Sequence, residues 1–139
     1  MRRLIVGLIC LGLFVAAQPA QAQGDGKLMV TATYTGQGGM KPGDVIRIFL
    51  FETPDIGAGS MPITTETIDK NGGMAHFTDL PAATVYLAMV FDEKGAIGAA
   101  PPPSGTPVAL HGPAGTAQAI PIGNDAKVTV TFDDSNRQP

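Results

Sequence analysis

Apolar and polar residues alternate with a period of two through much of the chain. The clearest example is the segment 27–35, where Leu28, Val30, Ala32 and Tyr34 face one way and methionine and threonine side chains face the other. This is the alternation of a strand with one buried face. No window repeats apolar residues at helical spacing over three turns, so we expect little or no helix.

Glycine and proline separate short runs rich in Val, Ile, Thr and Phe, which predicts about seven strands. We expect these strands to cover residues 27–35, 44–51, 63–69, 74–77, 84–92, 117–122 and 127–132. The second is apolar on both faces and should be central. Asn71-Gly72 should form a type I′ hairpin turn, and the last two strands should pair around residues 123–125. The pattern predicts an all-β fold, a single antiparallel β-sandwich of immunoglobulin-like or prealbumin-like type.

Residues 1–22 have the composition of a secretory signal peptide. Met1-Arg2-Arg3 is positive, residues 4–17 are almost uninterruptedly apolar, and Ala20-Gln21-Ala22 has the small-x-small pattern of a signal-peptidase site. We therefore expect cleavage after Ala22 and a periplasmic or extracellular protein. The apolar run is too short to span a bilayer, and no later segment has 18 consecutive apolar residues, so no membrane span is expected in the mature chain. The sandwich domain should cover residues 23–134, followed by a disordered tail at 135–139.

Cleavage would change both the cysteine content and the charge. It would remove Cys10, the single cysteine, so the mature chain should contain neither a disulfide nor a reactive thiolate. It would leave 7 basic and 12 acidic side chains, a formal net charge of 7 − 12 = −5. An acidic chain without a basic cluster argues against nucleic acid as a partner.

Two stretches of the chain have a sequence motif that extends beyond the alternation of single strands. They are Ala75-His76-Phe77-Thr78-Asp79-Leu80-Pro81 and the segment from Tyr86 to Gly95, followed by Gly105-Thr106-Pro107. Together they resemble prealbumin-like sandwiches known as carboxypeptidase regulatory-like domains, in particular small uncharacterised exported bacterial proteins of that kind. The glycine usual before Tyr86 is absent, and the acidic loop after the strand is reduced to residues 92–96. The resemblance implies a fold and an export route, and it implies no reaction.

Two metals have candidate ligands. Met74 and His76 share a strand face, and thioether with imidazole suits copper. Asp92 and Glu93 could hold calcium together with Asp133 and Asp134 if these loops meet. The competing interpretations are core-filling methionines, an exposed histidine and a solvated acidic turn. They outweigh both metals because no histidine cluster and no full set of oxygen ligands is present, so no cofactor is expected.

Catalysis and carbohydrate binding have weaker signals. Ser60, Ser104 and Ser135 are the serines available to pair with His76 or His111, and none lies in a Gly-x-Ser-x-Gly elbow. Carbohydrate binding usually needs an exposed aromatic platform, and there is no tryptophan. The following aromatic residues are all expected in the core: Tyr34, Phe49, Phe51, Phe77, Tyr86, Phe91 and Phe132.

The most promising functional segment is the loop expected at residues 98–115. It is rich in glycine and proline, is expected to contain no regular element, and is long enough to be functional or a plain linker. Pro101-Pro102-Pro103 favours a stiff segment that a partner could read. We expect the contact surface to include Asp92, Glu93, Pro101, Pro102, Pro103 and His111. The sequence thus predicts a non-catalytic exported module that binds an unknown protein or small ligand; a carbohydrate-, calcium- or copper-binding protein is the alternative.

Overall fold

The computed structural model describes residues 25–57, 59–113, 115–123 and 125–139. The expected signal peptide lies outside these residues. Within them the fold is all-β, with no α-helix and a single 3₁₀ turn, η1, at Glu93–Gly95. The strands are β1 Gly26–Tyr34, β2 Val45–Phe51, β3 Thr64–Ile68, β4 Met74–Leu80, β5 Thr84–Asp92, β6 Val108–Leu110, β7 Ile120–Pro121 and β8 Ala126–Phe132.

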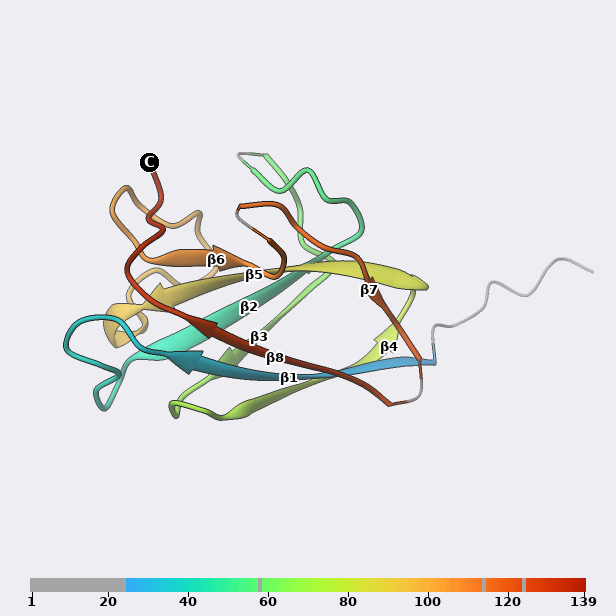
Figure 1. Ribbon diagram of the computed structural model, residues 1–139, viewed down its shortest axis with the longest axis horizontal. Helices are drawn as coiled ribbons and strands as arrows, with labels where there is room; N and C mark the ends of the chain where they lie inside the picture. Colours follow the sequence, from blue (N-terminus) through green and yellow to red (C-terminus); the bar gives the residue numbers. More distant parts are fainter. Residues whose placement is uncertain (1–24, 58, 114, 124) are drawn as a thin grey trace, which may run out of the picture.

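Two sheets enclose one core, the arrangement of a β-sandwich (Figure 1). One has the order β4-β1-β8, and the other has the order β3-β2-β5-β6, with β7 pairing the start of β5. The alternating side chains of β1, β2 and β5 supply most of the core, as the period of two predicts. The core strands contribute the following residues: Leu28, Val30, Ala32, Tyr34, Ile46, Ile48, Leu50, Val85, Leu87, Met89 and Phe91.

The last two strands do not pair with each other, so that prediction is wrong. Ile120 and Pro121 pair with Val85 and Thr84 of β5, whereas β8 joins the other sheet. Moreover, β8 runs parallel to β1, so the sandwich is not fully antiparallel; the two arrows point the same way in Figure 1. The chain between the two strands crosses from one sheet to the other, and a local turn signal cannot distinguish this crossing from a hairpin.

Asn71-Gly72 also lies in a crossing between sheets and not in a hairpin, because β3 and β4 belong to different sheets. Gly72 has φ +75°, but Asn71 is not among the non-glycine residues with positive φ, which excludes type I′. The Gly73 N–H donates to the Lys70 carbonyl at 2.9 Å. Positive φ at the third turn residue only is the type II pattern.

The segment 98–115 contains a strand, contrary to the expected irregular loop. Val108–Leu110 forms β6 and pairs with Val90, Met89 and Ala88 of β5. The tail after Phe132 is also held in place, where a disordered tail is expected. Its backbone pairs with residues 105–108 through three bonds: Val108 N–H to Asn136 O, Gly105 N–H to Gln138 O, and Gln138 N–H to Thr106 O. Backbone pairing of this kind depends little on side-chain pattern, which is why the sequence does not reveal it.

Candidate functional site

The structure assigns Asp92 a structural role and not a contact role. Its side chain is fully buried at the end of β5, and it lies diagonally across from Arg47 of β2. Arg47 Nε donates to Asp92 Oδ2 at 2.6 Å, while the N–H groups of Ile97 and Gly98 donate at 2.9 and 3.3 Å. Both carboxylate oxygens are therefore occupied, and a partner cannot reach them. Glu93, the next residue, is exposed and remains available.

A second buried acid fixes the turn after Asp92. Asp44 accepts from the N–H of Lys41 at 2.8 Å and from the N–H of Lys94 at 2.9 Å. These two backbone bonds, the Lys41 one foremost, hold the pKa of Asp44 below its ordinary value of 3.8. Lys94 has φ +58°, a conformation that costs free energy in a residue with a side chain. The bond to Asp44 offsets part of that cost and sets the direction in which the chain leaves η1.

The residues weighed as candidate copper and calcium ligands do not come together in the structure. Among the described residues, no three His, Cys, Asp or Glu side chains lie close enough together to hold a metal ion. Two of the four acids weighed as calcium ligands are engaged in hydrogen bonds of their own: Asp92 bonds to Arg47, and Asp134 bonds to Tyr34 and Gln37. Met74 and His76 are exposed on β4. Of the candidate serines, Ser60 donates its hydroxyl to the Asp55 carbonyl, and in the described part of the chain none hydrogen-bonds to a histidine.

The proline loop, which we define as residues 98–107, is exposed at Pro101 and Pro103 and anchored at both ends. The N–H of Gly98 is bound to Asp92. At the other end, Thr106 is buried and bonds to the Pro103 carbonyl through its N–H at 3.2 Å and its hydroxyl at 2.7 Å. The prolines therefore project from a short span between two fixed points.

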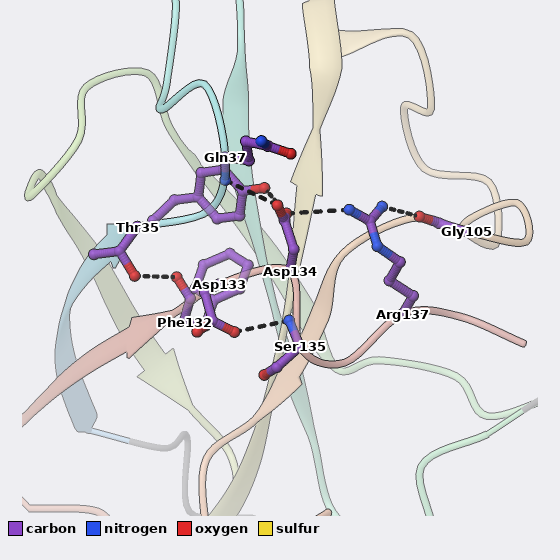
Figure 2. A network of polar contacts seen from close by, with 9 residues as sticks. Thr35, Gln37, Gly105, Phe132, Asp133, Asp134, Ser135 and Arg137 are labelled. Atoms are coloured by element: carbon purple, nitrogen blue, oxygen red, sulfur yellow. Dashed lines mark hydrogen bonds and ion pairs between the residues drawn. The ribbon is translucent and has the colours of Figure 1, made fainter.

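The tail closes the same end of the sandwich. Figure 2 shows Asp134 at the centre of a polar network that joins β1, β8 and the proline loop. Asp134 accepts from the Tyr34 hydroxyl and from the Gln37 N–H, and it pairs with Arg137 at 3.4 Å. Arg137 Nη1 in turn donates to the Gly105 carbonyl at 2.6 Å.

The pKa values of this network report the same contacts. Burial, followed by the hydrogen bond to Asp134, raises the pKa of Tyr34 to about 12. The Tyr34 hydroxyl, and then the Gln37 N–H, lower the pKa of Asp134. The Tyr34 ring also stacks on Phe91, with centroids 3.9 Å apart. The tail is thereby linked to the core, a role that the sequence does not indicate.

His111 lies apart from the other candidate residues. Its N–H donates to Leu87, whereas Pro107 at the end of the proline loop pairs with Phe91, four residues further along β5. His111 borders a groove of about 260 Å³ between β7 and β8. The lining includes His111, Gln118, Ile120, Pro121, Lys127 and Val128. The single contact surface expected from the sequence is thus two separate surfaces.

The outer face of the five-stranded sheet is a feature that the sequence reasoning missed. Phe49 and Tyr86 point away from the core, because their neighbours Ile48, Leu50, Val85 and Leu87 point into it. On the same face lie Val45, Phe51, Ala88, Val90, Val108 and Leu110, as the registers of β2 and β6 with β5 require. Phe51 and Val90 are buried, and the other four are half-buried. The apolar character of both faces of residues 44–51 is the signal that could have revealed it.

Comparison with protein-family models, with curated proteins and with solved structures found no match. The resemblance to prealbumin-like sandwiches therefore stays a prediction. No helix in the described residues is long and apolar enough to cross a membrane.

Proposed function

We propose that this chain is a non-catalytic, exported β-sandwich module that binds a partner protein. Its contact surface is the outer face of the five-stranded sheet together with the proline loop beside it. The observation that carries the proposal is the set of apolar side chains on this outer face, which is separate from the core set on the inner face. Phe49, Tyr86, Val108 and Leu110 are half-buried, so part of each side chain remains accessible to a partner. Apolar side chains grouped on one accessible face are a feature of interaction sites in soluble proteins.

The proline loop adds to this surface a shape that is fixed before binding. It begins where Gly98 bonds to Asp92 and ends where Pro107 pairs with Phe91, so it adjoins the outer face at the end of β5. A segment that is already ordered loses little conformational entropy on binding. Exposed prolines between fixed ends are therefore suited to recognition by a partner with an aromatic groove.

The buried acids support a binding role over a catalytic one. Both oxygens of Asp92 and both oxygens of Asp44 accept hydrogen bonds that hold β2, β5 and η1 together. The catalytic potential of a buried carboxylate depends on a free oxygen directed at substrate. These two carboxylates are engaged in stabilising the fold.

The test begins with capture of partners from the exported fraction of the native cell, followed by calorimetry with the partner so identified. Phe49→Thr removes an apolar side chain from the outer face while retaining good strand propensity. Met74→Thr is the matched control, since Met74 is 55 % exposed on the other sheet. We expect Phe49→Thr, and separately alanine at all three of Pro101–Pro103, to weaken binding at least about tenfold, a loss of about 1.4 kcal/mol.

Met74→Thr should bind as the wild-type protein does. Equal binding by all variants would refute this surface as the contact site. Turnover of a substrate by the purified protein, lost in Asp92→Asn or Asp44→Asn variants that remain folded, would refute the non-catalytic assignment.

A further inference from the structure

The outer edge of β8 carries unpaired backbone N–H and C=O groups, and it borders the groove between β7 and β8. The strand pairs with β1 on one side only, and it is the last strand of its sheet. The Phe132 carbonyl accepts from the Thr35 N–H, so the backbone groups of Phe132 face β1. Because these groups alternate along a strand, those of Val128 and Val130 face β1 as well. The N–H and C=O groups of Lys127, Thr129 and Thr131 therefore point outward.

No backbone hydrogen bond in the described part of the chain reaches this outer edge. Such an edge is a template for another strand. The side chains divide in the same way: Lys127, Thr129 and Thr131 are exposed, whereas Val128 and Val130 are half-buried against the core. A strand added here would extend the β4-β1-β8 sheet, and its inward side chains would enter the groove.

The size of the groove indicates what enters it. At about 260 Å³ it lies below the roughly 300–1,000 Å³ of pockets that enclose small-molecule ligands. Its lining combines Ile120, Pro121 and Val128 with the polar Gln118. A space of this size beside a free edge suits one or two small aliphatic side chains of an extended chain, held mainly by its backbone.

The charged residues that line the groove indicate which charge a bound chain should carry. The titratable lining residues are His111 and Lys127, and no acid lines the groove, although the chain as a whole has a formal charge of −3. The acidic residue nearest in sequence, Asp125, precedes the strand and is not part of the lining. A second copy of β8 would bring no acidic side chain of that strand to the groove, because its exposed side chains are those of Lys127, Thr129 and Thr131. An acidic extended peptide is complementary.

We infer that the outer edge of β8 is a binding site for an extended acidic peptide, which adds as a strand and places small apolar side chains in the groove. This site is separate from the outer-face surface proposed above. Loss of either one leaves the other intact.

The probe is the synthetic peptide acetyl-Asp-Val-Thr-Val-Thr-Val-Asp-amide, titrated into the purified protein and followed by backbone amide NMR and hydrogen exchange. In the free protein, the amides of Val128, Val130 and Phe132 should be protected and those of Lys127, Thr129 and Thr131 should exchange fast. The peptide should slow the second set by at least about tenfold, because only that set gains partners. Binding without this change, or no binding at millimolar peptide, overturns the proposal.

Backbone-directed variants supply the second test. Thr129→Pro removes one outward N–H at an edge position, where proline is tolerated. Thr129→Val is the matched control that retains this N–H. We expect the proline variant to weaken binding at least about tenfold and the valine variant to leave it within about twofold. If the proline variant does not fold, the wild-type protein is titrated instead with a peptide N-methylated at alternate residues. This peptide lacks the N–H groups needed to pair with the edge of β8. Equal binding of the methylated peptide overturns the proposal.

The charge is tested with Lys127→Glu, with Lys127→Gln as its uncharged control. The acidic peptide should bind more weakly to the Glu variant than to the Gln variant, and a peptide with Lys in place of both Asp residues should show the reverse order. Identical order for both peptides contradicts the acidic occupant. A second copy of the chain is the alternative occupant. It would be indicated if, without peptide, the protection of the outward amides rises with protein concentration and the protein has a dimeric mass. That result would overturn the proposal of a peptide site.

Discussion

Removal of the Asp92 carboxylate should destabilise the protein more than any surface substitution. In Asp92→Ala, Arg47 loses its only ion-pair partner among the described residues, and the N–H groups of Ile97 and Gly98 lose their acceptors. Breaking a buried charge pair by removing one partner costs about 3–5 kcal/mol. Asp92→Asn should cost nearly as much, because the amide NH₂ must face either Arg47 and Gly98, which donate to Oδ2, or Ile97, which donates to Oδ1. All three of these groups are donors themselves.

The assay is urea unfolding followed by circular dichroism, since the chain has no tryptophan. With a slope of about 2 kcal/mol per molar urea, a loss of about 4 kcal/mol lowers the midpoint by about 2 M. Glu93→Ala is the control: it removes the neighbouring exposed acid and should leave the midpoint within about 0.3 M, as expected of a surface change within about 0.5 kcal/mol.

Arg47→Met completes a double-mutant cycle with Asp92→Ala. The two losses should not add, because once Asp92 is gone the arginine no longer has a partner to lose. A midpoint for Asp92→Ala that matches Glu93→Ala would refute the structural role of Asp92. It would return this carboxylate to the exposed contact surface that the sequence alone predicts.

Three further outcomes follow from other hydrogen bonds. Asn71→Asp should destabilise the fold by about 1–3 kcal/mol in urea unfolding, because the Asn71 amide donates to the Tyr34 carbonyl at 2.9 Å and a carboxylate would repel it. In a Tyr86→Phe background, ultraviolet titration should place the pKa of Tyr34 at about 12, and Asp134→Asn should lower it. The raised pKa means that this group's contribution to stability is complete below the ordinary value of 10 and is lost as pH rises through 12. The lowered pKa of Asp44 means that its contribution is present above 3.8 and is lost as pH falls below it, so Asp44→Asn should flatten the acid limb of a stability profile.

The core was predictable because alternation alone specifies it. Once β1, β2 and β5 are identified by their period of two, the inward set follows residue by residue, and Val128 and Val130 of β8 pack against it as expected. The outer apolar face does not follow from the pattern, because a strand that is apolar on both faces, as residues 44–51 are, indicates burial at the centre of a sheet. The pattern therefore predicts Phe49 and Tyr86 in the core, whereas the registers put them on the opposite face.

The errors share a physical cause, which is backbone hydrogen bonding between segments far apart in sequence. Asn71 shows it most clearly. Its amide donates to the Tyr34 carbonyl and accepts from the Tyr34 N–H at 2.7 Å, so a side chain occupies the place of a neighbouring strand. The type I′ turn is predicted from the tendency of Asn to adopt positive φ. In the structure, the role of Asn71 is instead the pair of hydrogen bonds from its side chain to the Tyr34 backbone. The tail pairing with residues 105–108 is a second case, since it is made by main-chain groups that every residue carries.

The segment 98–115 does more than connect two strands. Loop length by itself costs little entropy, so a plain linker at this place could be shortened without loss of stability. The segment also includes β6, which supplies Ala109 to the core and pairs with β5, and the buried Thr106. Replacement would remove these contacts and the partner of the tail, so unfolding is the consistent outcome. The segment therefore contributes both to the packed structure and to the proposed contact surface. Pro101–Pro103 can face a partner because the residues on both sides of them are held by hydrogen bonds to the rest of the protein.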